Sequence, residues 1–157
     1  MGKGDDLREL MRRVPSPVAV VTIELDGRRT GLTVGSLVSL SLEPPLVGVS
    51  LSHEAQLHEL LKEVELFAVN ALAADQDGVA QHFARGVPPI AMWSGIRVRE
   101  SEAGPPLIEG AIGWLTCRRV QDVPIGDHTL FVGEVLRAEQ GAGGPALAYV
   151  GQRYVSL

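Results

Sequence analysis

The sequence predicts a mostly β fold: an antiparallel barrel with short helices at its rim. Short β-branched and apolar runs recur along the chain, and turn residues separate most of them, among totals of 18 glycines and 10 prolines. Only three brief segments have a helical period, which argues against a doubly wound parallel sheet. With 157 residues, of which 45% are hydrophobic, the chain is expected to form one domain over residues 1–157.

Three helices are expected, at residues 5–14, 52–63 and 74–84. The first has Asp6 and Glu9 as a capping box. Its apolar residues lie on one face: Leu7, Leu10, Met11 and Val14. The second has Ser52 as its N-cap. Its apolar residues are expected to point inward: Leu57, Leu60, Leu61 and Val64.

The remaining apolar runs are expected to be strands joined by tight turns. Asp26-Gly27 between two extended runs is the strongest short hairpin signal, and Pro44-Pro45 marks a second corner. A third turn, at Gly126-Asp127, precedes a strand expected to begin near Thr129. Strands are expected at residues 18–25, 28–34, 37–42, 46–52, 66–72, 95–100, 110–120, 128–139 and 146–157.

Charge and cysteine content exclude several classes of function. The net charge is −5 and no basic cluster is present, so nucleic-acid binding has no electrostatic support. The single cysteine, Cys117, excludes an intrachain disulfide and fits a reducing compartment. No apolar run approaches the ~20 residues of a membrane helix. These observations predict a cytoplasmic protein that binds neither membrane nor nucleic acid.

No motif for a metal site or a catalytic nucleophile is evident. His53 and His58 in "HEAQLH" are five residues apart, whereas a zinc-protease helix spaces its histidines by four. On a continuous helix they would lie about 140° apart, so we expect a solvated helix and no metal. No nucleophile elbow, P-loop or dinucleotide fingerprint is present either. The sequence therefore predicts no protein-borne catalytic residue and no metal ligand.

Two local features point to a ligand. In "TGLTVGSLVSLSL" the polar residues Thr33 and Ser36 break the strand period around Gly35, which suggests a loop or bulge whose backbone faces a ligand. The alternative is a row of hydroxyls on an exposed strand. His128 places an ionisable ring where the chain enters a strand. It either edges the turn or faces a ligand.

These segments, with three others in the same order, resemble a known family. They are residues 30–47 ("TGLTVGSLVSLSLEPPLV"), 67–76 ("FAVNALAADQ"), 81–84 ("QHFA") and 126–135 ("GDHTLFVGEV"), and "ALAYVGQRY" resembles a final strand. The family is the flavin reductase-like family, the short-chain NAD(P)H:flavin oxidoreductases that feed two-component monooxygenases. The resemblance implies an FMN-binding split barrel with a Greek-key antiparallel sheet. It also implies a homodimer with the flavin near the subunit interface.

The resemblance also implies a set of ligand contacts. FMN or FAD would be the flavin, and NADH or NADPH the co-substrate. The residues implied to line the flavin ring are Thr33, Val34, Gly35 and Ser36. Those near the ribityl chain and phosphate are Ser50, Leu51, Ser52, Phe83 and Ala84. His128, with Tyr154 as a second candidate, would meet the nicotinamide nucleotide.

The chain departs from the family pattern at two places. Gly35 and Leu37 replace the more usual Ser or Asn and Phe, and residues 86–93 lack a basic residue followed by Phe. We therefore take Arg85, or secondly Arg153, as the cation for the flavin phosphate. Three alternatives stay open. The protein is a non-catalytic flavin-binding or electron-carrier protein, an oxidase of a small metabolite, or a dimeric β-barrel without a cofactor.

Overall fold

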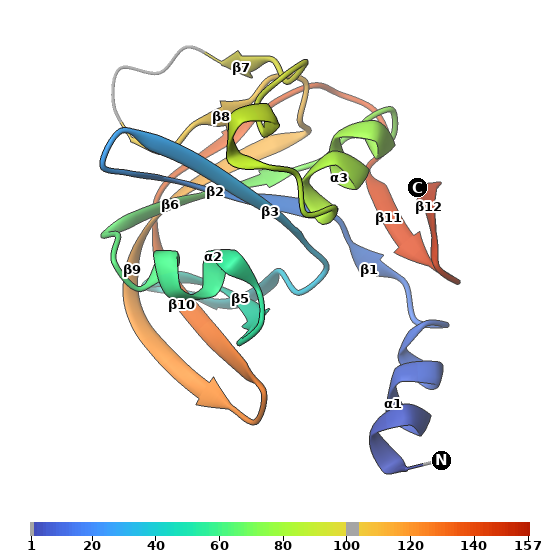
Figure 1. Cartoon of the computed structure of the whole chain (residues 1–157). Coiled ribbons are helices and arrows are strands. Elements are labelled where there is room, and N and C mark those ends of the chain that lie inside the picture. Colours follow the sequence, from blue (N-terminus) through green and yellow to red (C-terminus); the bar gives the residue numbers. More distant parts are fainter. Residues whose placement is uncertain (1, 100–103) are drawn as a thin grey trace.

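A seven-stranded antiparallel sheet, curled into an open barrel, forms the body of the protein (Figure 1). The computed structural model describes residues 2–99 and 104–157. The strands of the sheet run in the order β3-β2-β6-β9-β10-β5-β4. Their bounds are Ala19–Leu25 for β2, Arg28–Val34 for β3, Val38–Leu42 for β4, Pro45–Ser52 for β5, Leu66–Ala71 for β6, Gly113–Ile125 for β9 and His128–Gln140 for β10.

Two smaller sheets and short helices surround this barrel. The three-stranded sheet contains β1 (Ser16–Pro17), β11 (Leu147–Val150) and β12 (Arg153–Ser156), and the two-stranded sheet pairs β7 (Val98–Arg99) with β8 (Leu107–Ile108). The helices are α1 (Lys3–Met11), α2 (Gln56–Leu61), α3 (Asp77–Ala84) and the 3-10 turn η1 (Pro89–Ala91). α2 contacts both β3 and β5 and lies at the opening between them (Figure 1). The predicted mostly β barrel with peripheral helices is confirmed.

Turn chemistry explains two of the three turns that the sequence predicts, those at Asp26-Gly27 and Gly126-Asp127. Leu25 pairs with Arg28, so Asp26 and Gly27 alone connect β2 to β3. Both have positive φ, 52° and 77°, which is the mirror-image turn that matches the twist of paired strands. At the β9–β10 turn Gly126 has φ 58°. β10 begins at His128, one residue before its expected start.

Packing in the core explains why Gly133, in the "GDHTLFVGEV" run, has no side chain. Phe67 and Phe131 are fully buried in the main apolar cluster, together with Cys117. A Cβ at Gly133 would lie 2.5 Å from Cζ of Phe67 and 2.8 Å from Cβ of Cys117. Burial also raises the pKa of the Cys117 thiol to about 12. Gly133 therefore lets β10 approach β6 and β9 closely, and Cys117 is a core residue.

A buried polar network joins three strands around Asn70, which is fully buried on β6. Its amide nitrogen donates to the Val20 carbonyl at 2.9 Å and to Oγ1 of Thr22 at 3.2 Å. Its amide oxygen accepts the Ile108 N–H at 2.7 Å. Thr22 in turn donates to the Pro106 carbonyl at 2.6 Å. The network ties the 106–108 segment to the barrel wall and satisfies its own polar groups.

Two sequence predictions of helix capping were wrong. α1 begins at Lys3 behind Gly2, and no side chain caps it; the Asp5 and Asp6 amides donate to the Gly2 carbonyl instead of forming the Asp6–Glu9 box. α2 begins only at Gln56 because Ala55 is extended, so Ser52 is not its N-cap. The Ser52 hydroxyl accepts the Glu54 N–H within a turn.

Two predicted strands also differ in extent. Of residues 95–100 only Val98–Arg99 is a strand, and Glu100 lies outside the described residues. Residues 146–157 form two strands, β11 and β12, because Gly151 and Gln152 both have positive φ and reverse the chain.

Candidate functional site

The loop after β3 and the end of β5 meet at the opening of the barrel. Oγ of Ser36 accepts the Ser50 N–H at 3.0 Å and donates to the Ser50 carbonyl at 2.9 Å. β4 pairs with β5 only over residues 45–48, so residues 49–52 of β5 are not paired with β4. The structure thus brings residues 33–36 and 50–52 together, and we call the surface formed by these two segments the groove.

The side chains in these two segments are mostly engaged within the protein. Thr33 donates its hydroxyl to the Ala80 carbonyl at 2.7 Å, and the Ser36 hydroxyl is taken by Ser50. Val34 and Leu51 are buried in the main apolar cluster. What these residues can offer a ligand is therefore mainly their backbone, together with the small surface left by Gly35, which is exposed.

Phe83 of α3 packs against β3. Its ring lies against Gly31, where an added Cβ would be 2.9 Å from Cδ1 and Cε1. It also packs edge-to-face on Trp93, with ring centroids 5.1 Å apart. Phe83 is buried, whereas Ala84 and Arg85 are exposed. The aromatic ring is thus part of the second apolar cluster, and its two neighbours lie at the surface.

His128 is held at the mouth of the barrel. It pairs with Ser52 across the β5–β10 ladder, and its side chain is 46% exposed. Nδ1 lies 2.8 Å from Oδ1 of Asp127, and this hydrogen bond is the main cause of the lowered pKa of the Asp127 carboxyl. If Nδ1–H donates to Asp127, Nε2 is the ring atom available to a ligand.

Tyr154 does not lie beside His128 in this chain. It belongs to β12 in the three-stranded sheet, where its ring contacts Tyr149 at a centroid distance of 4.9 Å. Burial, followed by the nearby Tyr149 and Asp77, raises the pKa of its hydroxyl. The expectation that both residues share one pocket therefore has no support within a single subunit.

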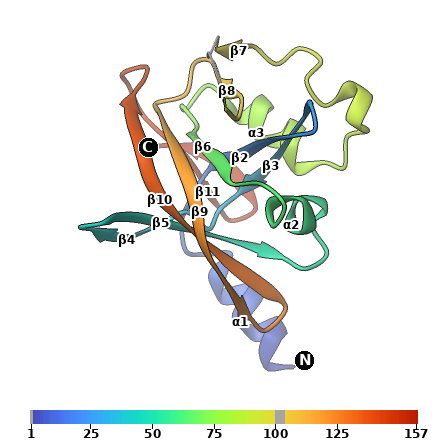
Figure 2. The ribbon, with the colours of Figure 1, turned by 90° about the vertical axis from the view of Figure 1, so that its left-hand side faces the viewer.

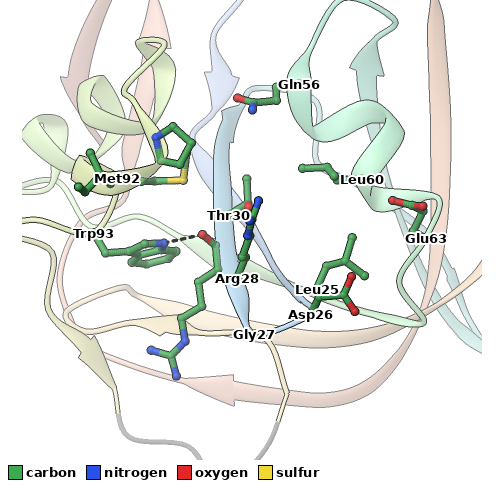
Figure 3. Close-up of a pocket in the computed structure, with 13 residues that line it drawn as sticks. Leu25, Asp26, Gly27, Arg28, Thr30, Gln56, Leu60, Glu63, Met92 and Trp93 are labelled. Carbon is green, nitrogen blue, oxygen red and sulfur yellow. Dashed lines mark hydrogen bonds between the residues drawn. The ribbon is translucent and has the colours of Figure 1, made fainter.

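A cavity of about 1000 Å³ lies next to this groove, between the β2–β3 hairpin, α2 and η1. Figure 3 shows Arg28 and Thr30 on β3, with Trp93 on one side and Gln56 of α2 on the other. Thr30 is three residues before Thr33 on β3, the edge strand of the sheet, so their side chains point to opposite faces and only the strand itself connects the cavity to the 33–36 loop. The cavity has the size of a cofactor site.

The residues of this cavity were missed by the sequence reading. Arg85 and Arg153, proposed as phosphate partners, do not line it, whereas Arg28 and Arg29 do. Arg29 is paired with Glu24 at 3.4 Å, and its carbonyl accepts the Trp93 indole N–H at 2.9 Å. For Arg28 no ion pair is found within residues 2–99 and 104–157. The signal that could have identified Arg28 is its place directly after the Asp-Gly turn.

The prediction that His53 and His58 point apart on a solvated helix was wrong. His53 precedes α2, so the helical angle does not apply, and the two ring centroids are 4.8 Å apart. His58 is only 2% exposed. In the part of the chain that the structure describes, no three His, Cys, Asp or Glu side chains are arranged to hold a metal ion. No helix of that part is long and apolar enough to cross a bilayer.

Together, the open barrel, the joined segments 33–36 and 50–52 and the arginine-bearing cavity are the features of a split barrel with room for a cofactor. Residues 11–157 match the model of the flavin reductase like domain. The chain belongs to this family, as its sequence motifs predicted.

Relatives and solved structures agree with this assignment. The chain is 34% identical to the reductase component of 4-nitrophenol 4-monooxygenase/4-nitrocatechol 2-monooxygenase from Rhodococcus opacus, over 94% of this chain and 78% of that protein. It is 37% identical to the reductase component of 4-hydroxyphenylacetate 3-monooxygenase from Thermus thermophilus, covering 96% and 94%. The NADH:FAD oxidoreductase of Streptomyces globisporus C-1027, solved with NAD and FAD fragments, has 33% identity and a TM-score of 0.90, covering 97% and 91%.

Proposed function

We propose that this single-domain protein is an NAD(P)H-dependent flavin reductase that transfers hydride from a nicotinamide nucleotide to FMN or FAD. The observation that carries the proposal is the pair of hydrogen bonds by which Ser36 holds the 33–36 loop against the end of β5. The relatives named above, which are reductase components of monooxygenases or an NADH:FAD oxidoreductase, support it.

The residues present fit a flavin. A flavin has a flat ring rich in heteroatoms and, as FMN or FAD, a phosphate-bearing tail. The groove offers backbone groups and small side chains to the ring, and the adjoining cavity offers the Arg28 guanidinium to the tail. Ser50 and Ser52 would lie along the ribityl chain between these two ends.

A bound flavin supplies the hydride-accepting chemistry, so the protein needs no nucleophile or acid–base pair of its own. This chain contributes position. The 33–36 loop is fixed by the Ser36–Ser50 hydrogen bonds, and His128 is fixed by Asp127 at the opposite end of the Ser50–Ser52 segment. His128 would orient the nicotinamide nucleotide at the mouth of the groove.

Calorimetric titration with FMN, FAD and riboflavin tests the binding half of this function. We expect binding of at least one phosphate-bearing flavin at micromolar concentration. Absence of binding for both FMN and FAD would overturn the proposal.

Arg28 is predicted to bind the flavin phosphate. Arg28→Gln removes a charged donor, so the affinity for FMN or FAD should fall about tenfold or more, because a hydrogen bond to a charged group contributes ~1.5–3 kcal/mol. Riboflavin, which has no phosphate, should bind equally well to variant and parent. Arg85→Gln is the matched control, an exposed arginine outside the cavity. Weaker FMN binding in Arg85→Gln than in Arg28→Gln would contradict the assignment.

We propose further that the protein is a homodimer. None of the α1 residues is buried, and three apolar side chains on one of its faces are exposed to solvent: Leu7, Leu10 and Met11. Val14, shortly after the helix, is exposed too. Figure 1 shows α1 standing away from the barrel, and in Figure 2 it lies behind the β9–β10 hairpin. Such a face needs a partner, and a second copy with a symmetric interface is the commonest one.

Light scattering should give twice the mass of one chain. Leu10→Glu puts a charge in the apolar face and should shift the equilibrium toward monomer, whereas Glu9→Lys, on the other side of α1, should not. A parent protein that is monomeric and still reduces flavin would refute the dimer.

Reduced flavin is proposed to pass to a partner monooxygenase in the cytoplasm, where NAD(P)H is available as reductant. A flavin carrier would bind flavin but ignore NADH. A metabolite oxidase would reduce oxygen directly at the expense of its own substrate. Visible spectra with and without NADH separate these functions from the proposed one.

A further inference from the structure

Two histidine rings meet at one buried hydroxyl beneath the start of β10. Oγ1 of Thr129, which is 2% exposed, lies 2.7 Å from Nε2 of His58 and 3.2 Å from Nε2 of His53. On its other side, Nδ1 of His58 lies 3.0 Å from Oε1 of Glu59. We call His53, Thr129, His58 and Glu59 the histidine chain. The proposed reaction does not otherwise use it.

Hydrogen-bond chemistry gives this chain a direction. A carboxylate only accepts, so Nδ1 of His58 carries the hydrogen that Glu59 receives. In a neutral His58 ring, Nε2 is then a lone pair and accepts the Thr129 hydrogen. The Thr129 oxygen, having donated its only hydrogen, accepts from Nε2–H of His53. The exposed ring of His53 is thereby set with its hydrogen on Nε2.

The two rings respond differently to a proton. His53 can become charged without any change, because its Nε2–H already donates to Thr129. A charged His58 instead has a hydrogen on Nε2, so Thr129 must turn its own hydrogen toward His53, whose Nε2 must then be a lone pair. Charging both rings would leave the Thr129 hydrogen without an acceptor and place two like charges 4.8 Å apart. The chain therefore holds a charge on one ring at a time.

The location of the chain connects it to the proposed site. The His53 N–H donates to the Asp127 carbonyl at 3.0 Å, and Ser52 pairs with His128 across the ladder. Thr129 therefore joins the 52–55 loop, through His53, to its neighbour on β10, His128, which is proposed to meet the nicotinamide. Flavin and nicotinamide nucleotides both carry phosphate, so their binding favours a charge on the exposed His53 ring over one on the buried His58 ring.

We infer that His58 is a positioning residue of the proposed flavin and nucleotide site. Acting through Thr129, it sets the hydrogen of His53 and holds the 52–55 loop against β10, and its protonation reverses the chain and weakens ligand binding. This inference rests on the proposed function.

The charged surroundings of the chain come from α2, the loop and the hairpin turn. They are Glu59 and Lys62, Glu54, and Asp127 with His128. The hydrogen bond from His58, then the charge of Lys62, lowers the pKa of Glu59, and the His128 hydrogen bond lowers that of Asp127. Both carboxylates are thus favoured in the ionised form, in which they accept hydrogen bonds.

Nitrogen NMR of the ligand-free protein tests the chain independently of any activity. In the neutral state His58 should have its hydrogen on Nδ1. His82 is an internal reference of the opposite tautomer, because its Nε2 lies 2.6 Å from the Met92 carbonyl and must donate to it. A hydrogen on Nε2 of neutral His58 would overturn the inference.

Flavin affinity as a function of pH, measured by calorimetry, tests the coupling. Thr129→Val should weaken binding about tenfold at neutral pH, the effect of one lost hydrogen bond, and Thr129→Ser should restore it. The parent should lose affinity as the pH is lowered, because a protonated His58 reverses the chain. In His58→Gln the side-chain carbonyl still accepts from Thr129 but cannot be protonated, so this acid-side loss should disappear.

The outcomes separate the inference from the proposed function. An unchanged flavin affinity in Thr129→Val, or an unchanged pH dependence of flavin affinity in His58→Gln, would overturn the inference. The proposed function would still stand in that case, because the parent binds flavin. A parent that binds no flavin would overturn both. Should His58→Gln fail to fold, the Thr129→Val and Thr129→Ser pair decides by the same criterion.

Discussion

Replacing Asn70 with alanine is expected to lower the free energy of unfolding by about 3 kcal/mol. The change removes two donated hydrogen bonds and one accepted one, and leaves the Ile108 N–H without its partner in the protein interior. Each unsatisfied buried polar group costs ~1–3 kcal/mol, so the sum lies well above that of a typical surface change. Asn70 is the only asparagine in the chain, and β2, β6 and β8 all depend on it.

Denaturant unfolding, followed by far-ultraviolet circular dichroism, measures this effect. A loss of 3 kcal/mol corresponds to a fall of roughly 6–12 °C in melting temperature for a chain of this size. Thr22→Ser is the matched control, because it keeps the hydroxyl that donates to Pro106 and should change stability little. A loss below ~1 kcal/mol in Asn70→Ala would show that water or local relaxation satisfies the network equally well.

Replacing His128 with alanine is expected to lower kcat/KM for NAD(P)H by one to two powers of ten. The basis is a lost hydrogen bond to a strongly polar nucleotide, which contributes ~1.5–3 kcal/mol. Flavin affinity should change little, because the proposed flavin contacts come from the 33–36 loop, the end of β5 and Arg28. The effect should therefore be confined to one of the two substrates.

Steady-state kinetics with flavin titrated separately distinguishes this role from that of a turn residue. Asp127→Ala, which removes the group that orients the ring at 2.8 Å, should reproduce part of the loss without touching the nucleotide. A residue that merely edges the turn would lower the melting temperature slightly and spare both substrates. Unchanged kcat/KM for NADH and for NADPH in His128→Ala would assign His128 to the turn.

Local chemistry made much of the fold predictable. The Asp26-Gly27 pair determines its own hairpin, because both residues tolerate positive φ, and β3 has the bounds that the run "RRTGLTV" indicates. Helix starts were less predictable. Ser52 and Asp6 are both good cap residues, yet an extended Ala55 delays α2 and the Gly2 carbonyl begins α1. Capping signals compete with backbone conformations that are set by the neighbouring strands.

The site was only partly predictable, for a physical reason. The 33–36 segment was identified because a broken strand period is visible in the sequence, whereas residues 50–52 were implied only by the family resemblance. The cavity was not identified, because Arg28 and Trp93 are distant in the chain and become neighbours only when η1 folds against β3. The contact between His53 and His58 was missed for a related reason: it depends on Thr129 of β10, which no helical projection of residues 53–58 contains.

The most direct test of the central claim is the visible spectrum of flavin mixed with this protein and NADH or NADPH without oxygen. A flavin reductase should bleach many equivalents of FMN or FAD per protein chain, far faster than the nucleotide alone does. Bleaching no faster than in the protein-free control, with flavin demonstrably bound, would contradict the claim.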